Sequence, residues 1–263
     1  MGQWQQWHDL WCLAPVGADR GLIEFIGGSY LAASPQISYR RLLEELARNG
    51  WRIHAWCYVP GFDHQNQANA AWRCFRQARR EQESKPQAKQ ANRPQLKPLR
   101  LGHSLGCKLQ LLAPDGGRGC RGLVALSFNN FSAERSVPLL AEMGQQFGFR
   151  SEFSPSPQET LELVRQGYTQ PRNLLVRFSR DGIDQSQRLI DVLRGRLGDQ
   201  SELIELPGDH LTPSSAGLRR QLLGAWADDP RRQRDMQQLA VAIGNWGADA
   251  NTDHTAAWGH GGS

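Results

Sequence analysis

The sequence has no apolar run long enough to cross a membrane. Its 263 residues contain no uninterrupted apolar stretch of about 18 residues, and the mean hydropathy is −0.57. Residues 1–13 also lack the basic start and the apolar core of a secretory signal. We therefore expect a cytoplasmic protein without a transmembrane segment.

Cysteine is scarce, and its spacing differs from that of a disulfide framework or a zinc site. The chain has five cysteines, an odd number, and no two of them form a CxxC pair. The glycine-rich segment 116–119 lacks the lysine and the spacing of a phosphate-binding loop. We therefore expect reduced thiols, and neither a metal nor an organic cofactor.

The positive charge of the chain is local. The net charge is +5, but residues 76–100 alone carry eight cations against Glu81 and Glu83, so the remainder is close to neutral. Residues 83–97 are too polar to bury themselves and lack the interleaved aromatics that stack on bases. We expect a polar, basic surface insert and no nucleic-acid partner. Contact of residues 76–100 with a polyanion or a membrane surface is a weaker alternative.

Short apolar stretches alternate with amphipathic ones along the chain. This alternation is typical of a doubly wound α/β domain, with a mostly parallel sheet and helices on both faces. The expected strands are residues 22–26, 51–59, 98–101, 122–128, 173–178 and 201–206, and the expected helices begin near residues 35, 68, 105, 189 and 218.

One domain is expected over residues 1–227, with an interruption. Residues 131–171 contain four prolines and two short helical patterns instead of the regular alternation, which indicates a small lid inserted into the fold. Residues 228–263 are expected to form a C-terminal extension. It has one helix near Met236–Ile243, and we expect its end, rich in glycine and histidine, to be disordered.

The segment Gly102-His103-Ser104-Leu105-Gly106 matches the pattern Gly-x-Ser-x-Gly between a short strand and an amphipathic helix. This pattern is the nucleophile elbow of serine hydrolases, a turn so tight that only small residues fit on both sides of the serine. Ser104 is therefore the expected nucleophile. We assign His103 to packing, and Cys107 to the same role as a small apolar group.

A nucleophilic serine needs a base to take its proton and a carboxylate to orient that base. In elbow-containing folds these groups follow in the order serine, acid, histidine. His210 comes after the last expected strand and is the only later histidine inside the expected domain. Asp181 and Asp184 both follow the strand 173–178. Asp181 has the usual offset and is favoured, while Asp184 remains the alternative because it could instead cap the next helix.

An acyl-transfer site also needs two N–H donors for the oxyanion of the tetrahedral intermediate. One is expected from the backbone of Leu105, the residue after the nucleophile. The second should come from the loop after strand 22–26, where Gly28 and Ser29 are the candidates. A glycine there allows the backbone to approach a ligand closely, although a tight turn would explain it equally well.

Six short motifs occur together: FIGGSY at 25–30, SPQISYR at 34–40, YVPGFDH at 58–64, GHSLG at 102–106, SFNNFS at 127–132 and GDHLTP at 208–213. In combination they resemble an uncharacterised α/β-hydrolase-like family of cyanobacteria and plant chloroplasts, a domain of unknown function. The resemblance covers about residues 21–226. It implies the α/β-hydrolase fold and a photosynthetic source, and it supplies no substrate.

Four residues of these motifs have no place in a serine–histidine–acid arrangement. Asp63, His64, Asn129 and Asn130 follow strand ends, at the edge where open α/β sheets bind ligands. We expect them at the rim of the site, with turn formation as the alternative explanation.

Together these features predict a serine hydrolase that acts on a small ester or thioester through an acyl-serine intermediate. The apolar side chains of Leu139, Leu140, Met143, Phe147 and Phe149 in the expected lid suggest a lipid-like acyl group. The motifs do not separate hydrolysis from acyl transfer, and they leave the oligomeric state open. The alternative is a non-catalytic protein of the same fold, serving as a binding or assembly factor in a photosynthetic cell.

Overall fold

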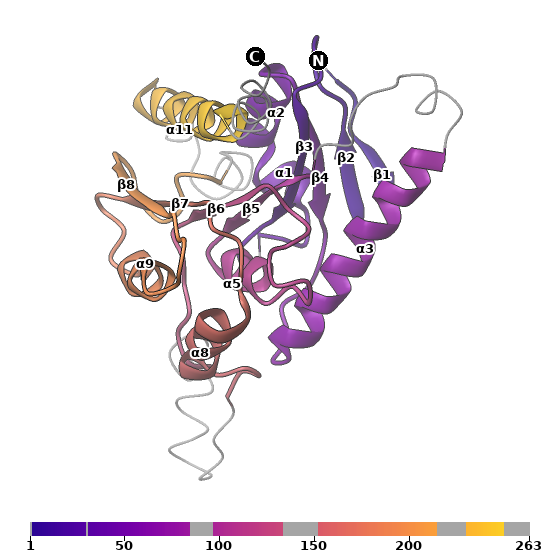
Figure 1. The fold of residues 1–263 in the computed structure, drawn as a ribbon. Helices are drawn as coiled ribbons and strands as arrows, with labels where there is room; N and C mark the ends of the chain where they lie inside the picture. Colours follow the sequence, from indigo (N-terminus) through magenta and orange to yellow (C-terminus); the bar gives the residue numbers. More distant parts are fainter. Residues whose placement is uncertain (1, 30, 85–96, 134–151, 215–229, 250–263) are drawn as a thin grey trace, which may run out of the picture.

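The computed structural model describes residues 2–29, 31–84, 97–133, 152–214 and 230–249. Figure 1 shows a central sheet with helices packed against both of its faces. Most of the expected basic insert, part of the expected lid, the helix expected from residue 218 and residues 250–263 lie outside the described residues. No helix in the described part of the chain is both long and apolar enough to cross a membrane.

The sheet has eight strands in the order β1-β2-β4-β3-β5-β6-β7-β8. From β4 to β8 neighbouring strands are parallel, whereas β1 and β2 pair antiparallel with each other, and β2 pairs antiparallel with β4. The strands are β1 Gln5–Trp7, β2 Leu10–Leu13, β3 Gly21–Ile26, β4 Trp51–Trp56, β5 Leu99–His103, β6 Gly122–Leu126, β7 Asn173–Phe178 and β8 Glu202–Leu206.

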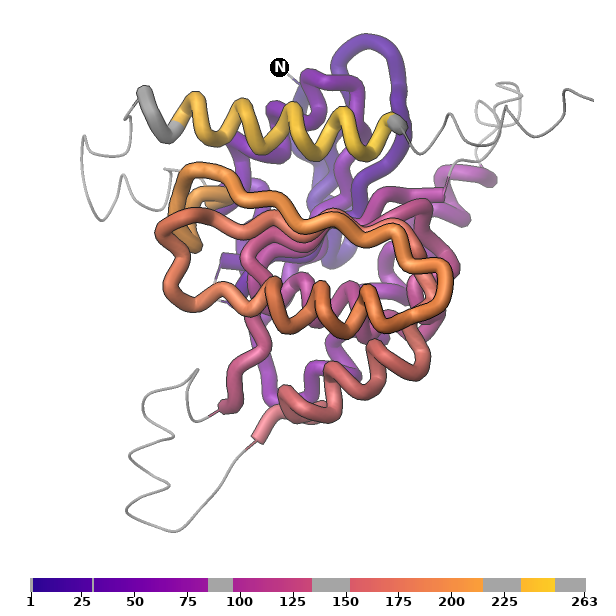
Figure 2. Tube along the Cα trace, turned by 60° about the vertical axis from the view of Figure 1, so that its left-hand side comes forward, coloured from indigo at the N-terminus to yellow at the C-terminus, as the bar shows by residue number. Residues whose placement is uncertain are grey.

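Alternating side chains of each central strand enter two different cores. In β6, Val124 and Leu126 join the core that also holds buried residues of helices α2 and α11. Leu123 and Ala125 of the same strand join the core beneath α5, α8 and α9. Figure 2 shows α11 on one side of the sheet and α9 on the other. The helices are α1 Pro35–Ser38, α2 Arg40–Arg48, α3 His64–Ser84, α5 Leu105–Leu111, α8 Pro157–Gly167, α9 Ser186–Arg194 and α11 Pro230–Asp249.

The C-terminal helix is part of this core. The helix expected near Met236–Ile243 runs from Pro230 to Asp249, and Leu239 and Ile243 are completely buried against the sheet side that α2 covers. Residues 230–249 thus complete the hydrophobic layer of the domain. The expected boundary at residue 227 had instead placed them in an extension outside the domain.

The described part of the expected lid includes a regular helix. Ser156 caps α8 through a capping box with Glu159, and Val164 is buried against residues of α9. Of the prolines that break the alternation, Pro155 precedes this helix, Pro157 is its first residue and Pro171 follows it. Residues 134–151, which hold the apolar side chains expected in the lid, lie outside the described residues, so the lid itself stays a prediction.

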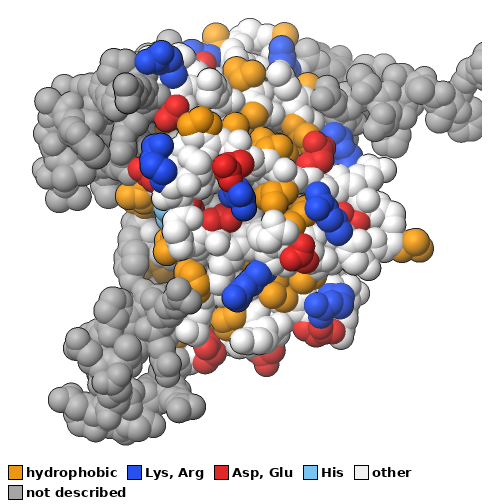
Figure 3. Space-filling model, turned by 90° about the vertical axis from the view of Figure 1, so that its left-hand side faces the viewer, with side chains coloured by type: hydrophobic (Ala, Val, Ile, Leu, Met, Phe, Trp, Pro, Cys, Tyr) orange, Lys and Arg blue, Asp and Glu red, His pale blue; other side chains and the backbone are white. Residues whose placement is uncertain are grey.

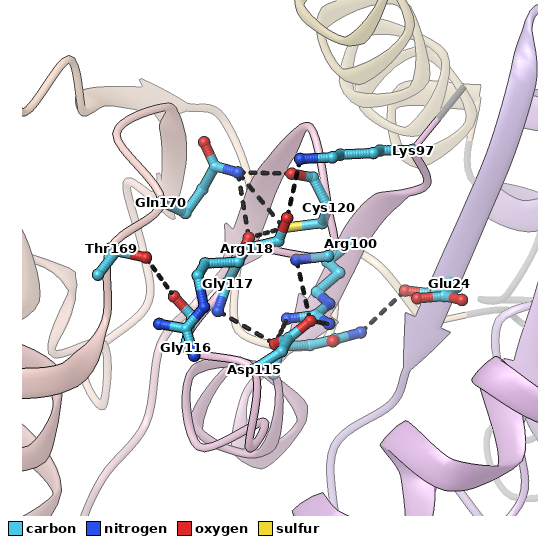
Figure 4. A network of polar contacts seen from close by, with 12 residues as sticks. Glu24, Lys97, Arg100, Asp115, Gly116, Gly117, Arg118, Cys120, Thr169 and Gln170 are labelled. Atoms are coloured by element: carbon cyan, nitrogen blue, oxygen red, sulfur yellow. Dashed lines mark hydrogen bonds and ion pairs between the residues drawn. The ribbon is translucent and has the colours of Figure 1, made fainter. Parts of the chain in front are cut away.

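A buried ion pair fixes the strand that leads to Ser104. Arg100 of β5 is 2% exposed, and its two terminal nitrogens lie 2.9 and 2.7 Å from the two carboxylate oxygens of Asp115. Asp115 also accepts hydrogen bonds from the backbone N–H groups of Gly117 and Gly119, as Figure 4 shows for part of this network. Because every buried polar group in this pair is satisfied, it ties β5 to the loop after α5.

Candidate active site

Ser104 lies in a strained turn between β5 and α5. Its backbone has φ +54° and ψ −120°, a conformation that non-glycine residues rarely adopt and that is typical of functional sites. A β-carbon on Gly102 would lie 2.7 Å from the α-carbon of Cys107, and one on Gly106 would lie 2.7 Å from the carbonyl carbon of Ile26. The turn therefore requires glycine on both sides of the serine.

The structure brings Ser104, His210 and Asp181 together from three separate strand ends. The Oγ atom of Ser104 lies 3.0 Å from Nε2 of His210, and Nδ1 of His210 lies 2.8 Å from a carboxylate oxygen of Asp181. Asp181 follows β7 and its carboxylate is fully buried, while the His210 side chain is 19% exposed. This is the mutual geometry of a nucleophile, its base and an orienting acid.

The two candidate aspartates have different surroundings. Burial alone would raise the pKa of Asp181, but the hydrogen bond from His210, together with the charge of His210 and further hydrogen bonds to the carboxylate, outweighs it and holds that pKa below its usual range. Burial raises the pKa of Asp184, whose carboxylate accepts hydrogen bonds from the backbone N–H and the hydroxyl of Ser186, at the start of α9. Asp184 thus accepts hydrogen bonds at the start of α9, and Asp181 is the carboxylate that is hydrogen-bonded to His210.

The two candidates for the second oxyanion donor also differ. The N–H of Gly28 already donates to the hydroxyl of Tyr39 at 2.8 Å inside the core, so the expectation that Gly28 could serve is corrected. A β-carbon on Gly28 would lie 3.0 Å from that of Ser104, so the residue is needed as a close neighbour. Ser29 lines the cavity beside Ser104 and Leu105. No hydrogen bond among the described residues uses the N–H of Ser29 or Leu105.

His103 does more than pack. Its Nε2 lies 2.8 Å from the carbonyl oxygen of His210 and its Nδ1 lies 2.8 Å from the hydroxyl of Tyr39. A carbonyl only accepts, so Nε2 carries the proton and Nδ1 accepts from Tyr39, whose oxygen accepts from the N–H of Gly28. This buried chain joins the loop after β3, the elbow and the loop that carries His210.

The four expected rim residues divide into two groups. His64, Asn129 and Asn130 line the cavity next to Ser104. The Asp63 carboxylate instead accepts a hydrogen bond from the N–H of Asn66 at the start of α3, and Asp63 is absent from the cavity lining. The alternative explanation of turn formation therefore applies to Asp63.

Cys107 is buried, and burial raises the pKa of its thiol, in keeping with the packing role expected from the sequence.

The cavity beside Ser104 has a volume of about 350 Å³. Most of its wall is apolar, but it also contains the nearly buried side chains of His64, Lys108 and Asn130. Sequence reasoning missed Lys108. Its signal was its position, because it is the one charged residue of α5, four places after Ser104, and its immediate neighbours Cys107 and Leu109 are apolar.

Three buried histidines make stability depend on pH. Burial lowers the pKa of His54 to about 4, and that of His64 and His103 to about 3, from 6.5. Below pH 6.5 the unfolded chain takes up protons that the native protein does not, so the stabilisation is complete above pH 6.5 and falls on acidification. From pH 7 to pH 5 we expect a loss of about 2 kcal/mol per histidine.

Urea unfolding at the two pH values measures this effect. The loss should be smaller in His54→Gln, which removes one of the three groups. A free energy of unfolding that is the same at pH 7 and pH 5 would contradict the assignment of three neutral, buried imidazoles.

The strand order, with serine, aspartate and histidine after β5, β7 and β8, defines a protein of the α/β-hydrolase fold. The chain belongs to the family described as "Protein of unknown function (DUF1350)", whose model matches residues 3–246. That match extends further at both ends than the resemblance over residues 21–226. No curated protein matches the chain.

Solved structures with similar folds come from several hydrolases. The monoacylglycerol lipase of Paleococcus ferrophilus has a TM-score of 0.57 at 16% identity, covering 92% of this chain and 99% of its own. The esterase domain of a Rhodothermus marinus protein has a TM-score of 0.54 at 15% identity, covering 91% and 92%. The thioesterase domain from the curacin biosynthetic pathway has a TM-score of 0.52 at 11% identity, covering 92% and 99%. At these identities the likeness concerns the fold.

Proposed function

We propose that the protein is a serine hydrolase that cleaves an ester or thioester through an acyl-Ser104 intermediate. The observation that carries the proposal is the continuous hydrogen-bonded arrangement from Ser104 Oγ through His210 to Asp181. A strained serine, a base within hydrogen-bond reach and a buried carboxylate behind that base are the parts that nucleophilic acyl transfer requires.

The proposed reaction has two halves. His210 Nε2 takes the proton of Ser104 as Oγ attacks the carbonyl carbon, and the N–H groups of Leu105 and Ser29 hold the oxyanion. The intermediate collapses by releasing an alcohol or thiol, which receives the proton from His210. Water, deprotonated by His210, then attacks the acyl-enzyme. The second tetrahedral intermediate releases the carboxylic acid, and Ser104 Oγ takes the proton back from His210. An alcohol or amine in place of water would give an acyltransferase by the same steps.

Asp181 supports this cycle electrostatically. Its carboxylate accepts from Nδ1 of His210, which leaves Nε2 free of a proton in the resting state and stabilises the imidazolium formed during attack. The pKa of Asp181 lies below its usual range, so the carboxylate is ionised at neutral pH. Asp181 is the acid in the proposal, and Asp184 is not.

The cavity and the structural neighbours support an acyl substrate. Apolar side chains of Phe62, Leu105, Phe131, Phe153 and Ile183 line the space beside Ser104, which suits the hydrocarbon part of an acyl group. The neighbours bear the names lipase, esterase and thioesterase, which favours the same substrate class here. The five cysteines, all within the described residues, form no disulfide with one another, which supports a cytoplasmic location. The photosynthetic source stays a prediction.

One face of the molecule carries charges of both signs. On the face shown in Figure 3, Lys and Arg side chains are interspersed with Asp and Glu. A surface that binds a polyanion carries an excess of positive charge, so this face does not favour such a partner.

Asp181→Asn tests the proposed roles. We expect it to lower kcat by about 10³- to 10⁴-fold, because the amide cannot stabilise the imidazolium and favours the wrong tautomer. Turnover of p-nitrophenyl butyrate, and of an alkyl thioester monitored by thiol release, measures this loss. Asp184→Asn is the matched control and should keep kcat near that of the wild type. A folded wild type that turns over neither substrate class would contradict the proposal.

A further inference from the structure

A buried lysine lies in the cavity next to the nucleophile. Lys108 is four positions after Ser104, one turn further along α5, and only 1% of its surface is exposed. Its Nζ donates one hydrogen bond, to the carbonyl oxygen of Pro155 at 2.8 Å, and lies 5.8 Å from the centre of the Phe153 ring. An ammonium group has three donors, so two are available for another acceptor.

The charge of Lys108 has no close counterion among the described residues. Burial lowers its pKa to about 8, although the negative charges of Glu152 and Glu159 act to raise it. The group is therefore still cationic at neutral pH. Neither carboxylate forms an ion pair with it. Glu152 accepts from the N–H groups of Ala133 and Phe153, and Glu159 belongs to the capping box of α8. Buried charges are normally paired, so the surroundings of Lys108 suit an anionic ligand.

His64 adds a second polar group to the same place. It is 2% exposed, lines the cavity, and its ring stacks on Phe153 with the centroids 4.2 Å apart. Neither ring nitrogen has a hydrogen-bond partner in the described part of the chain. Burial, with the nearby charge of Lys108, lowers its pKa to about 3. The ring is therefore neutral, with one N–H donor unused, and a buried unsatisfied donor is costly unless a ligand meets it.

We propose that Lys108 and His64 form a subsite for a carboxylate carried by the substrate, so that the preferred ester or thioester has an acidic end in the cavity beside Ser104. This deepens the proposed hydrolase function and rests on it for the reaction. The apolar wall accepts the hydrocarbon chain, and the ammonium and imidazole N–H meet the carboxylate at its far end. A neutral lipid-like acyl chain would leave both donors unpaired.

Matched substrate pairs test this subsite. The first pair is mono-p-nitrophenyl adipate and the same ester with its free carboxylate capped by a methyl group. The second pair, p-(butanoyloxy)benzoate and its methyl ester, carries the carboxylate on the alcohol side. We expect the wild type to prefer the carboxylate in one of the pairs by about 10- to 100-fold in kcat/KM, as for a hydrogen bond to a charged group.

Three variants and one control identify the residues. Lys108→Met should abolish the preference, Lys108→Arg should restore part of it, and His64→Phe, which keeps the stacking on Phe153, should weaken it. Lys97→Met is the control, because exposed Lys97 also donates to a backbone carbonyl, that of Arg118 at 3.0 Å, but does not line the cavity. It should keep the wild-type ratio.

Binding separates this inference from the proposed reaction. Calorimetric titration of monomethyl adipate and dimethyl adipate into Ser104→Ala requires no catalysis. Carboxylate binding that Lys108→Met removes, without turnover by the wild type, would support the subsite and refute the hydrolase. Turnover without a carboxylate preference in either pair, a preference that survives in Lys108→Met, or no carboxylate binding at all would overturn the subsite.

Discussion

Replacing Ser104 by alanine is expected to lower the turnover of an ester or thioester by about 10⁵-fold or more. The substitution removes the hydroxyl that lies 3.0 Å from His210 Nε2, so the covalent route is lost, and water in the cavity is a far weaker nucleophile. The fold should be kept, because alanine has nearly the same shape as serine and meets the same backbone strain at φ +54°.

Steady-state kinetics with urea unfolding of the same samples checks this expectation. Ser84→Ala, at the end of α3 and remote from the cavity, is the control and should be as active as the wild type. Wild-type-like turnover by Ser104→Ala would place the reaction elsewhere and would remove the acyl-serine intermediate from the account.

Gly106→Ala is expected to destabilise the protein by more than about 4 kcal/mol, or to prevent folding. A β-carbon there would lie 2.7 Å from the carbonyl carbon of Ile26 and 2.8 Å from the carbonyl oxygen of Gly27. These are backbone atoms of β3 and the loop that follows it, so they cannot rotate away as the end of a side chain could. The helix after the nucleophile would have to move away from the sheet.

Gly167→Ala is the matched control for this substitution. Gly167 ends α8, and a β-carbon there would meet nothing within 4 Å, so alanine should be neutral or slightly stabilising. Chemical denaturation of the two variants gives the comparison. Equal stability of Gly106→Ala and the wild type would mean that α5 does not pack as closely on β3 as described.

The proximity of Ser104 and His210 in the candidate site was predictable from the sequence, because there the chain order alone decides. Ser104 and His210 follow from the elbow motif and from the position of a histidine after the last strand. The choice between Asp181 and Asp184 requires the structure. Both residues follow β7, and only the path of the loop decides which carboxylate contacts His210. The choice between Gly28 and Ser29 likewise depends on Tyr39, whose hydroxyl takes up the N–H of Gly28.

Other features left little trace in the sequence. The antiparallel strands β1 and β2 have only three and four residues, too few for a periodic pattern, and the pairing of β2 with β4 is a long-range contact. Lys108 was missed because lysine is normally a surface residue, and its burial depends on the segment around Phe153 and Pro155. The helix α11 extends beyond residue 243 because its buried face continues to Trp246, three residues after Ile243.

The network around His103 suggests why the elbow contains a histidine. A single imidazole joins the carbonyl of His210 to Tyr39, and Tyr39 joins the loop that carries Ser29. His210, the proposed base, and the loop that carries Ser29, a proposed oxyanion donor, are thereby held by the same buried hydrogen bonds. Precise placement of such groups is worth far more in an active site than the stability of the individual hydrogen bonds.

Covalent labelling with a fluorophosphonate probe tests the central claim most directly, because the probe phosphonylates only an activated serine. Mass spectrometry of the digested wild type should find the label on the peptide that contains Ser104, and both Ser104→Ala and His210→Ala should lose it. A folded wild type that remains unlabelled, or that carries the label on another serine, would contradict the account of Ser104 as a nucleophile activated by His210.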